Sequence, residues 1–254
     1  MLFLLAGTSD ARALGVQLQN AGYPVLASVV TESAASSLRK EGLSVTVGRK
    51  SADEMARLFS ENGTRAVVDA SHPFAEEASR NAMEAATIAG IPYIRYERPS
   101  SELSEHPNLH LARDYRNAAE LAASFGGTIF LTTGSKTLPI FAEVLLKDPT
   151  IRMICRILPT EENMRTCTAL GIPQRNIVAM QGPYTSTLNA AFYEHFGVTT
   201  LVTKESGSEG SVMEKIQPAL DRGIHTIVIC RPGIQYEHLC HSAGEVLETL
   251  DRLP

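Results

Sequence analysis

The stretch LFLLAGTSDARAL, residues 2–14, decides how the chain begins to fold. Its apolar run, residues 2–5, stops at a turn of small residues, 6–9, and an Ala- and Leu-rich helical pattern starts directly after the turn. This order is typical of a strand, a tight loop and the N-terminus of a helix. The segment therefore has the form of the first half of a βαβ unit.

The same alternation of strand-like runs and helical patterns continues in two series: 23–30, 65–70 and 91–96, then 128–134, 151–158, 176–182, 199–207 and 225–232. It is typical of parallel α/β sheets. Between the series, PSSELSEHPNLH at residues 99–110 is polar, contains two prolines and lacks a clear period, which indicates a linker. We therefore predict an α/β protein of two Rossmann-like parallel-sheet domains, residues 1–100 and 101–254, with a ligand cleft between them.

Charge and composition narrow the classes of partner. The 254 residues are 44% hydrophobic and 20% charged, which is ordinary for a globular protein. The formal net charge of −5 provides no positive field for a nucleic acid backbone. No apolar run approaches the roughly 20 residues that span a bilayer, and the first residues lack the pattern of a signal peptide. We expect a cytoplasmic protein with neither a nucleic acid nor a membrane as partner.

Cysteines and histidines offer no strong metal signal. Four cysteines lie far apart, which favours free thiols over disulfides, and Cys155 and Cys230 stand in apolar runs typical of a core. The stretch HLCH, residues 238–241, packs three potential ligands into four residues. That spacing does not match common zinc sites, and no second ligand group stands nearby. We expect a solvated turn there, before a last helix at residues 243–253, and no metal bound by the protein.

Phosphate-binding features occur where the first two strands end, the edge at which parallel sheets bind ligands. Gly7 allows a ligand to approach the backbone, while Thr8 or Ser9 can cap the helix. The dinucleotide fingerprint is only partly matched, so a capped turn that binds nothing remains an alternative. After the second strand, Thr31 and Ser33 suit a 2′-phosphate, with Arg39 or Lys40 near, whereas Glu32 favours a free ribose hydroxyl unless it points outward; the choice stays open.

Polar loops also follow later strands. In DASHPF, residues 69–74, we expect Pro73 in the first turn of the next helix and His72 at the mouth of the site, as a ligand contact or as a structural residue. TTGSK at 132–136 repeats the small-residue turn, and TKESGSEG at 203–210 adds Lys204 to a Gly/Ser loop suited to anions. Neither loop has the G-K-[ST] ending of a Walker motif, so ATP hydrolysis is not indicated.

Seven short motifs, taken in order, resemble the precorrin-6A and cobalt-precorrin-6A reductases of cobalamin biosynthesis: GTSDAR (7–12), DASHPFA (69–75), LTTG (131–134), RILP (156–159), QGPY (181–184), TKESG (203–207) and RP (231–232). Each motif alone is weak, but their order along nearly the whole chain is specific. Ala6 and Asp10 depart conservatively from the commoner GGTSE opening. The resemblance implies a fold of two Rossmann-like domains, in which strands can be exchanged between the domains.

The resemblance implies an oxidoreductase that acts on a CH–CH group, delivering hydride from NADPH to one double bond of a corrinoid macrocycle to give the precorrin-6B level. Its other partners would be neighbouring pathway enzymes, in transient contact. It implies cofactor-binding roles for Gly7, Thr8, Ser9, Asp10, Thr31, Ser33, Ser71, His72 and Pro73. It implies substrate-binding roles for Thr132, Thr133, Gly134, Arg156, Tyr184, Lys204, Glu205 and Gly207.

For catalysis the resemblance points to Lys204, Ser206 and His72. Reduction also needs a proton, and Lys204 is the first candidate for its donor, held by Glu205 and Ser206; a carboxylate clamp without a proton role is the alternative. Two other functions compete. A short-chain-type oxidoreductase is disfavoured because no Tyr-x-x-x-Lys pair follows a serine at helical spacing, whereas a nucleotide-binding redox or ligand sensor without turnover stays as the runner-up. Whether the substrate carries cobalt and how many subunits assemble stay open.

Overall fold

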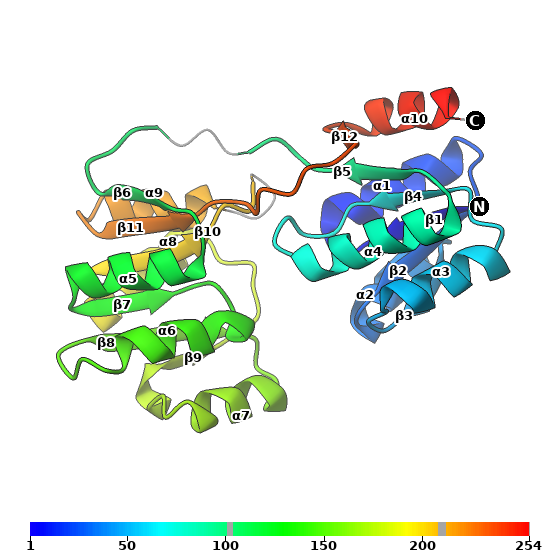
Figure 1. Ribbon diagram of the computed structural model, residues 1–254. Coiled ribbons are helices and arrows are strands. Elements are labelled where there is room, and N and C mark those ends of the chain that lie inside the picture. The colour runs from blue at the N-terminus through cyan, green and yellow to red at the C-terminus, as the bar shows by residue number, and fades with distance from the viewer. Residues whose placement is uncertain (101–103, 208–211, 254) are drawn as a thin grey trace. The chain divides into compact units, whose positions relative to one another are not determined.

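The computed structural model describes residues 1–100, 104–207 and 212–253, which form two compact α/β units (Figure 1). The first unit comprises Met1–Pro99 and Gly233–Pro254, and the second unit comprises Ser100–Pro232. The two parallel-sheet domains predicted from the sequence are confirmed. No helix among the described residues is both long and apolar enough to cross a membrane.

The first unit contains a six-stranded parallel sheet of order β12-β5-β4-β1-β2-β3. Its strands are β1 (Leu2–Leu5), β2 (Val25–Val29), β3 (Ser44–Val47), β4 (Ala66–Asp69), β5 (Tyr93–Tyr96) and β12 (His238–Cys240). Its helices are α1 (Ser9–Asn20), α2 (Glu32–Lys40), α3 (Ala52–Glu61), α4 (Glu76–Ala89) and α10 (Ala243–Arg252).

The second unit repeats this architecture with the order β6-β11-β10-β7-β8-β9, again parallel. Its strands are β6 (Leu109–Ala112), β7 (Thr128–Leu131), β8 (Arg152–Ile157), β9 (Ile177–Ala179), β10 (Thr200–Lys204) and β11 (His225–Ile229). Its helices are α5 (Tyr115–Phe125), η1 (Ser135–Thr137), α6 (Leu138–Leu145), α7 (Glu161–Ala169), η2 (Gln174–Asn176), α8 (Ser186–Phe196) and α9 (Met213–Leu220).

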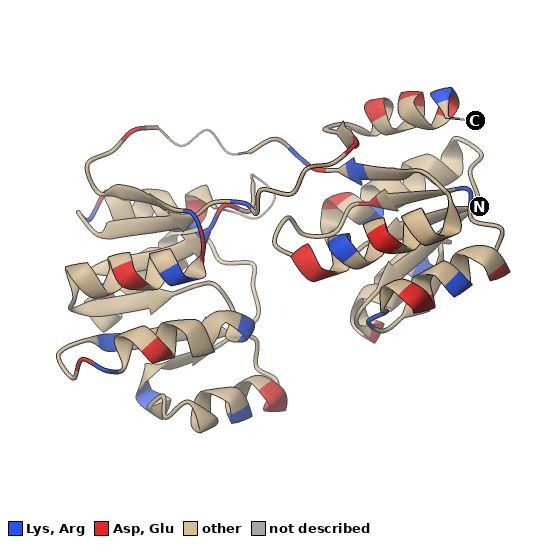
Figure 2. Cartoon of the chain, viewed as in Figure 1, with Lys and Arg blue, Asp and Glu red and all other residues tan. Residues whose placement is uncertain are grey.

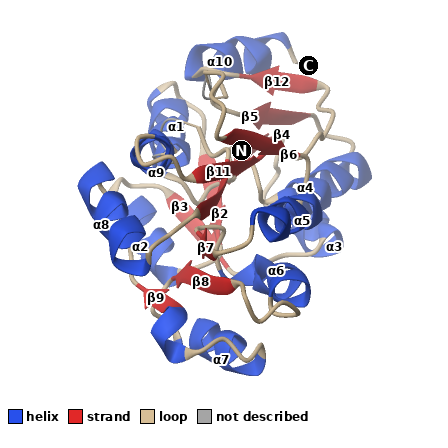
Figure 3. Ribbon diagram, turned by 90° about the vertical axis from the view of Figure 1, so that its left-hand side faces the viewer, coloured by secondary structure: helices blue, strands red, loops and turns tan. Residues whose placement is uncertain are grey.

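Helices cover both faces of each sheet (Figure 3), which explains why the central strands are continuous apolar runs. In β1, alternate side chains serve opposite faces: Leu2 and Leu4 pack in the cluster that contains residues of α1, α2 and α10, whereas Phe3 and Leu5 pack with residues of α3 and α4. All four side chains are buried. The two faces of the first sheet thus have separate apolar cores.

The sixth strand of the first sheet, β12, comes from residues that follow the second unit in the sequence. β6 follows β5 in sequence but pairs with β11, and β12 follows β11 but pairs with β5, with His238 opposite Ile94. The structure therefore corrects the predicted domain of residues 101–254, because its last segment belongs to the first unit. It also corrects two local predictions: residues 238–240 form a strand with buried Cys240, not a solvated turn, and residues 109–110 of the predicted linker begin β6. Residues 101–103 of that linker and 208–210 of the Gly/Ser loop lie outside the described residues.

The four cysteines are free thiols. Cys155 is fully buried, as predicted, and its Sγ lies 3.8 Å from that of Cys167, too far for a disulfide bond. The prediction for Cys230 is wrong, because this residue is only half-buried just after β11 ends.

A histidine pair fastens the edge strand β6 to β11. His110 Nε2 lies 3.3 Å from His225 Nδ1, and the Phe125 ring of α5 stacks on the His225 ring with 4.1 Å between centroids. Burial, and secondly the neighbouring His225, hold the pKa of His110 below its ordinary value. The unfolded chain therefore binds this proton more tightly than the folded chain does.

We expect the free energy of unfolding to fall as pH decreases from about 6.5 toward the lowered pKa of His110, because the pair then has to accept a proton. Urea unfolding at several pH values would measure this dependence. His110→Asn should reduce it, while His195→Asn, on the exposed surface of α8, should leave it unchanged. An equal pH dependence in all three proteins would contradict the assignment.

Candidate functional site

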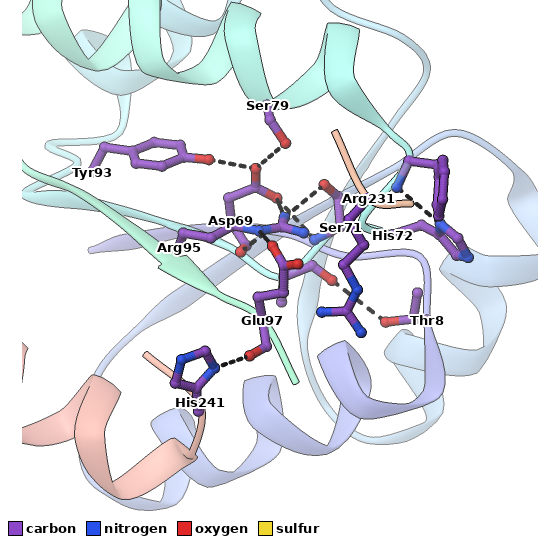
Figure 4. Close-up of polar contacts among 12 residues, drawn as sticks. Thr8, Asp69, Ser71, His72, Ser79, Tyr93, Arg95, Glu97, Arg231 and His241 are labelled. Atoms are coloured by element: carbon purple, nitrogen blue, oxygen red, sulfur yellow. Dashed lines mark hydrogen bonds and ion pairs between the residues drawn. The ribbon is translucent and has the colours of Figure 1, made fainter. Parts of the chain in front are cut away.

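The strand order of each sheet reverses at one point, between β1 and β4 in the first unit and between β7 and β10 in the second. Open α/β sheets bind ligands beside the carboxyl ends of the strands at such a point. In the first unit the two loops meet there, because Thr8 Oγ1 donates a hydrogen bond of 3.4 Å to the carbonyl of Ala70 (Figure 4). The predicted residues of the loops after β1 and β4 are therefore neighbours.

The loop after β1 combines a helix cap with open space. Thr8 is the N-cap of α1 and accepts a hydrogen bond of 3.3 Å from the Ala11 amide. A Cβ added to Gly7 would meet no protein atom within 4 Å, and the backbone there is not left-handed. The fold itself thus tolerates a side chain at this position. The amides of the first turn of α1 point outward and favour an anion.

A cavity of about 200 Å³ lies beside this loop, where β1 and β2 end. It is lined by Gly7, Thr8, Ser9, Arg12, Val29, Ala34, Ser37 and Leu38. Neither Thr31 nor Ser33 is among these residues: Thr31 caps α2 by accepting from the Ala34 amide at 3.3 Å, and the Ser33 carbonyl accepts from Ser37 Oγ. Glu32 forms an exposed ion pair with Arg39 at 2.9 Å and does not line the cavity.

Asp10, in the first turn of α1, lies near a basic residue. Its Oδ1 is 3.5 Å from Nη2 of Arg98, which follows β5, and both side chains are mostly buried. The arginine offsets a carboxylate that would otherwise repel an anion at the helix N-terminus.

The loop after β4 is anchored by a buried charge network (Figure 4). Asp69 and Arg95 lie opposite each other on β4 and β5, and Nη1 of Arg95 is 3.0 Å from Oδ1 of Asp69. Asp69 Oδ2 accepts hydrogen bonds of 2.6 Å from Ser79 Oγ and from Tyr93 OH. Burial, and secondly the charge of Asp69, raise the pKa of Tyr93 well above its ordinary value, so this phenol keeps its proton.

The amide and the hydroxyl of Ser71 are both held by this network. Its amide donates to Asp69 Oδ1 at 2.8 Å, and its Oγ accepts from Arg95 Nη1 at 3.2 Å. Because Arg95 is the donor in this bond, the hydroxyl hydrogen of Ser71 points elsewhere. The network thus fixes the start of the DASHPF loop in one orientation.

The remainder of the DASHPF loop differs from the prediction. α4 begins at Glu76, with Ala75 as its N-cap and no side-chain cap, so Pro73 precedes the helix instead of lying in its first turn. Pro73 is buried and His72 is half-buried. His72 Nδ1 accepts a hydrogen bond of 3.2 Å from the Phe74 amide, which fixes the orientation of the ring. The other ring nitrogen, Nε2, therefore lies on the side of the ring away from this amide.

The network also reaches the segment around β12, residues 233–241. Arg95 Nε is 3.0 Å from Glu97 Oε2, and the Glu97 carbonyl lies 2.6 Å from Nδ1 of His241, which follows β12. The ring of Tyr236 stacks on that of Tyr93, with 6.2 Å between centroids. Strand exchange therefore completes the surroundings of the loop after β4.

In the second unit, the loop after β7 repeats the arrangement of small polar residues. Thr132 Oγ1 donates to the Val202 carbonyl at 3.0 Å, and Thr133 Oγ1 accepts from Thr137 Oγ1 at 2.8 Å. Gly134 has a φ of +85°, a conformation that favours glycine, and therefore turns the chain from β7 into η1. These contacts tie the TTG loop to the neighbouring strand β10.

Arg156 is a buried cation at the end of β8. Its Nη1 donates to Asn189 Oδ1 at 2.7 Å, and its Cζ lies 3.7 Å from the ring centroid of Tyr184. Burial lowers the pKa of Arg156 from its ordinary value. The described part of the chain places no carboxylate in an ion pair with this guanidinium. An anionic ligand would compensate the charge.

Two lysines add to this positive region. Burial, and secondly Lys136, lower the pKa of Lys204 to about 8, and burial with Arg156 and then Lys204 lowers the pKa of Lys215 to about 8. Lys204 ends β10 and Lys215 lies in α9. Elsewhere on the protein, acidic and basic residues both occur along the helices (Figure 2). The loop edge of the second unit therefore suits an anion.

Glu205 links the loop after β10 to residues further along the chain. Its carboxylate forms an ion pair with Nε of Arg231, which follows β11, and accepts from the Gly207 amide at 3.0 Å. Glu205, Ser206 and Gly207 are all buried. The pair joins the loop after β10 to the chain that leaves β11.

Sequence reasoning missed Arg12, Arg95, Lys215 and Arg231 as members of these clusters. The spacing of Arg12, four residues after Thr8, was an available signal, since that spacing places both on one face of a helix. Arg95 becomes informative only once β4 and β5 are in register. Among the described residues, no group of three His, Cys, Asp or Glu side chains could hold a metal ion.

Known proteins that are similar to this chain match it over almost its whole length. A cobalt-precorrin-6A reductase from Priestia megaterium is 49% identical over 250 residues, covering 98% of each chain. Another from Salmonella typhimurium is 40% identical over 255 residues, covering 99% of this chain and 95% of the relative. A solved structure, CobK precorrin-6A reductase, shares the fold with a TM-score of 0.78 at 22% identity, covering 98% of this chain and 96% of that chain.

A family model described as precorrin-6x reductase CbiJ/CobK matches residues 1–251. The resemblance carried by the seven motifs is confirmed: the chain belongs to the precorrin-6x reductase family CbiJ/CobK.

Proposed function

We propose that this protein uses NADPH to reduce one double bond of cobalt-precorrin-6A, giving the precorrin-6B level of the cobalamin pathway. The observation that carries the proposal is the full-length correspondence with cobalt-precorrin-6A reductases at 49% and 40% identity. Relatives named precorrin-6A reductase, without cobalt, are less similar, at 32% and 23% identity. The relatives at 49% and 40% identity favour the cobalt-containing substrate, while four other cobalt-precorrin-6A reductases, at 30–32%, are about as similar as the 32% relative.

The first unit offers features that fit a dinucleotide. The amides at the start of α1, the open space above Gly7 and the adjacent cavity suit phosphate groups and a ribose. The Asp10–Arg98 pair offsets the acid beside them. In this proposal Gly7, Thr8 and Ser9 hold the phosphates, and Ser71, His72 and Pro73 border the nicotinamide. NADPH, when bound, supplies the hydride.

The second unit offers features that fit the substrate. The macrocycle carries acetate and propionate groups, which are anions at neutral pH. Arg156, Lys204 and Lys215 form a positive region that lacks compensating charge around Arg156, and Thr132 to Gly134 supply polar groups beside it. We infer that the substrate carboxylates bind at this loop edge. The Tyr184 ring, which packs against the Arg156 guanidinium, would orient that group for them.

Lys204 is proposed as the proton donor. Reduction of a conjugated double bond adds a hydride and a proton, and the hydride comes with the cofactor. An ammonium group whose pKa lies at about 8 is still mostly protonated at neutral pH and gives up its proton more readily than an ordinary lysine. Solvent can then protonate Lys204 again for the next turnover.

The test is an anaerobic assay of the purified protein with NADPH or NADH, followed by absorbance near 340 nm, the band of reduced nicotinamide. We expect the band to disappear only when cobalt-precorrin-6A is added, faster with NADPH than with NADH. Precorrin-6A, tested in parallel, should react more slowly. Tight nucleotide binding without oxidation of NADPH by either macrocycle would contradict the proposal and favour a nucleotide sensor.

Gly7→Ala should separate cofactor binding from folding. A methyl group there meets no protein atom, so the melting temperature should stay within about 2 °C of the wild type. The same methyl group would occupy the space through which a phosphate approaches the backbone, so the Kd for NADPH should rise about tenfold or more. Calorimetric titration measures the Kd.

The matched control for Gly7→Ala is Gly244→Ala in α10, where the added Cβ makes an ordinary contact of 3.8 Å with Ser242 Oγ. Gly244→Ala should change neither the melting temperature nor the Kd for NADPH appreciably. If both variants bind NADPH as the wild type does, the loop after β1 is not the phosphate site.

A further inference from the structure

We propose that Arg12 binds the 2′-phosphate of the cofactor and thereby selects NADPH over NADH. The inference rests on the proposed function, since it needs a nicotinamide dinucleotide on the first unit. It assigns the choice of cofactor to a residue in α1, instead of to Thr31 and Ser33 at the start of α2.

The position of Arg12 directs its side chain toward the cavity at the ends of β1 and β2. Arg12 stands one turn after the N-cap Thr8, and its amide donates to the Thr8 carbonyl at 3.2 Å. Long side chains on a helix lean back toward its N-terminus, over the preceding turn. Arg12 accordingly lines the cavity of about 200 Å³ together with Ser9 and Ser37.

The charge of Arg12 is available for a ligand. Within the described parts of the chain Arg12 forms no ion pair with a carboxylate, and none of the residues that line the cavity is acidic. An arginine stays charged throughout the working pH range and can give two parallel hydrogen bonds to a phosphate. The cavity is thus positive at the place where α/β dinucleotide sites hold the adenosine ribose.

Glu32, the acidic residue that would favour NADH, forms an ion pair with Arg39 and not with a ligand in the cavity. An acidic side chain near the end of β2 normally accepts hydrogen bonds from the free ribose hydroxyls and repels a 2′-phosphate. Here Glu32 pairs with Arg39 at 2.9 Å, its side chain is 71% exposed, and it does not line the cavity. The Thr31 hydroxyl already caps α2. These contacts leave Arg12 as the group that meets a 2′-phosphate.

Binding of nucleotide fragments tests the inference without turnover. Calorimetric titration of the full chain with 2′,5′-ADP and with 5′-AMP compares the same nucleoside with and without the 2′-phosphate. We expect Arg12→Ala to weaken 2′,5′-ADP binding about 10- to 100-fold, the range for a lost charge-assisted contact, and to leave 5′-AMP binding unchanged. Arg12→Lys should fall between the wild type and Arg12→Ala. Ser37→Asp, which adds a negative charge to the cavity wall, should also weaken 2′,5′-ADP selectively.

Two further arginine variants serve as comparisons. Arg57→Ala removes an exposed positive charge from α3, outside the residues that line the cavity, and should behave as the wild type. Arg39→Ala should also keep the preference for 2′,5′-ADP; a loss in this variant would move the role to α2 and overturn the inference. So would a wild-type preference that survives Arg12→Ala. A wild type that binds neither fragment nor NADPH would instead overturn the proposed cofactor, and the inference with it.

Discussion

Replacing Arg95 by methionine is expected to lower the free energy of unfolding by about 3–5 kcal/mol, the largest effect on stability that we predict. Arg95 and Asp69 are both fully buried, and the variant leaves the Asp69 carboxylate without its cation. Asp69 would keep the hydrogen bonds from Ser79 and Tyr93, which compensate only part of the buried charge. Urea unfolding measured by circular dichroism gives the difference.

Arg80→Met is the matched control for Arg95→Met. Arg80 also pairs with a carboxylate, that of Glu76 at 2.7 Å, but both side chains are exposed, so its loss should cost about 0–1 kcal/mol. Tyr93→Phe is a milder variant that removes one hydrogen bond to Asp69 and should cost about 1–2 kcal/mol. Equal stabilities for Arg95→Met and Arg80→Met would show that the buried network does not stabilise the first unit.

Lys204→Met should reduce kcat by about 100-fold or more, since proton transfer by a positioned group contributes about 10²- to 10⁴-fold. Binding of NADPH, which we assign to the first unit, should not change. Single-turnover oxidation of NADPH at 340 nm and separate NADPH titration distinguish the two. Lys204→Arg separates proton donation from electrostatic support, because an arginine keeps the positive charge but does not release a proton near neutral pH. Recovery of activity in Lys204→Arg would identify a carboxylate clamp.

The pH profile of kcat/KM gives an independent measurement of Lys204. Its pKa of about 8 predicts that kcat/KM falls above pH 8, where the amine has lost the proton that it must donate. Lys136 is exposed and contributes to lowering this pKa, so Lys136→Met should move the descending limb to higher pH. A limb that stays in place in Lys136→Met, or persists in Lys204→Met, belongs to another group.

The sequence predicts the central strands well because they are apolar on both faces. The run at residues 151–158, for example, became β8, whose residues after Arg152 are buried. The edge strands β6 and β12 were missed for a physical reason: Leu111 is 61% exposed and Leu239 is 46% exposed, so no periodic burial marks them. Backbone pairing with β11 and β5 holds these strands, and their partners lie far away in the sequence.

For the candidate site, the sequence locates the loops but not the contacts within them. GTSDAR and DASHPF are marked by small and polar residues after apolar runs, and the structure brings Thr8 and Ala70 together. The charge partners depend on register and helix phase: Asp69 meets Arg95 across two strands, and Glu205 meets Arg231 across two loops. No local pattern encodes such pairs, so the sequence did not predict the partners Arg95 and Arg231.

The position of β12 after the second unit also sets an order of events during synthesis. The first five strands of the N-terminal sheet leave the ribosome early, but β12, which completes the edge beside β5, is made only after the whole second unit. Until then a nascent chain presents β5 with an unpaired backbone edge, the feature through which incomplete sheets associate with one another. A chain that stops before residue 233 would keep that edge open permanently. Completion of the first sheet therefore depends on residues that are translated after the whole second unit.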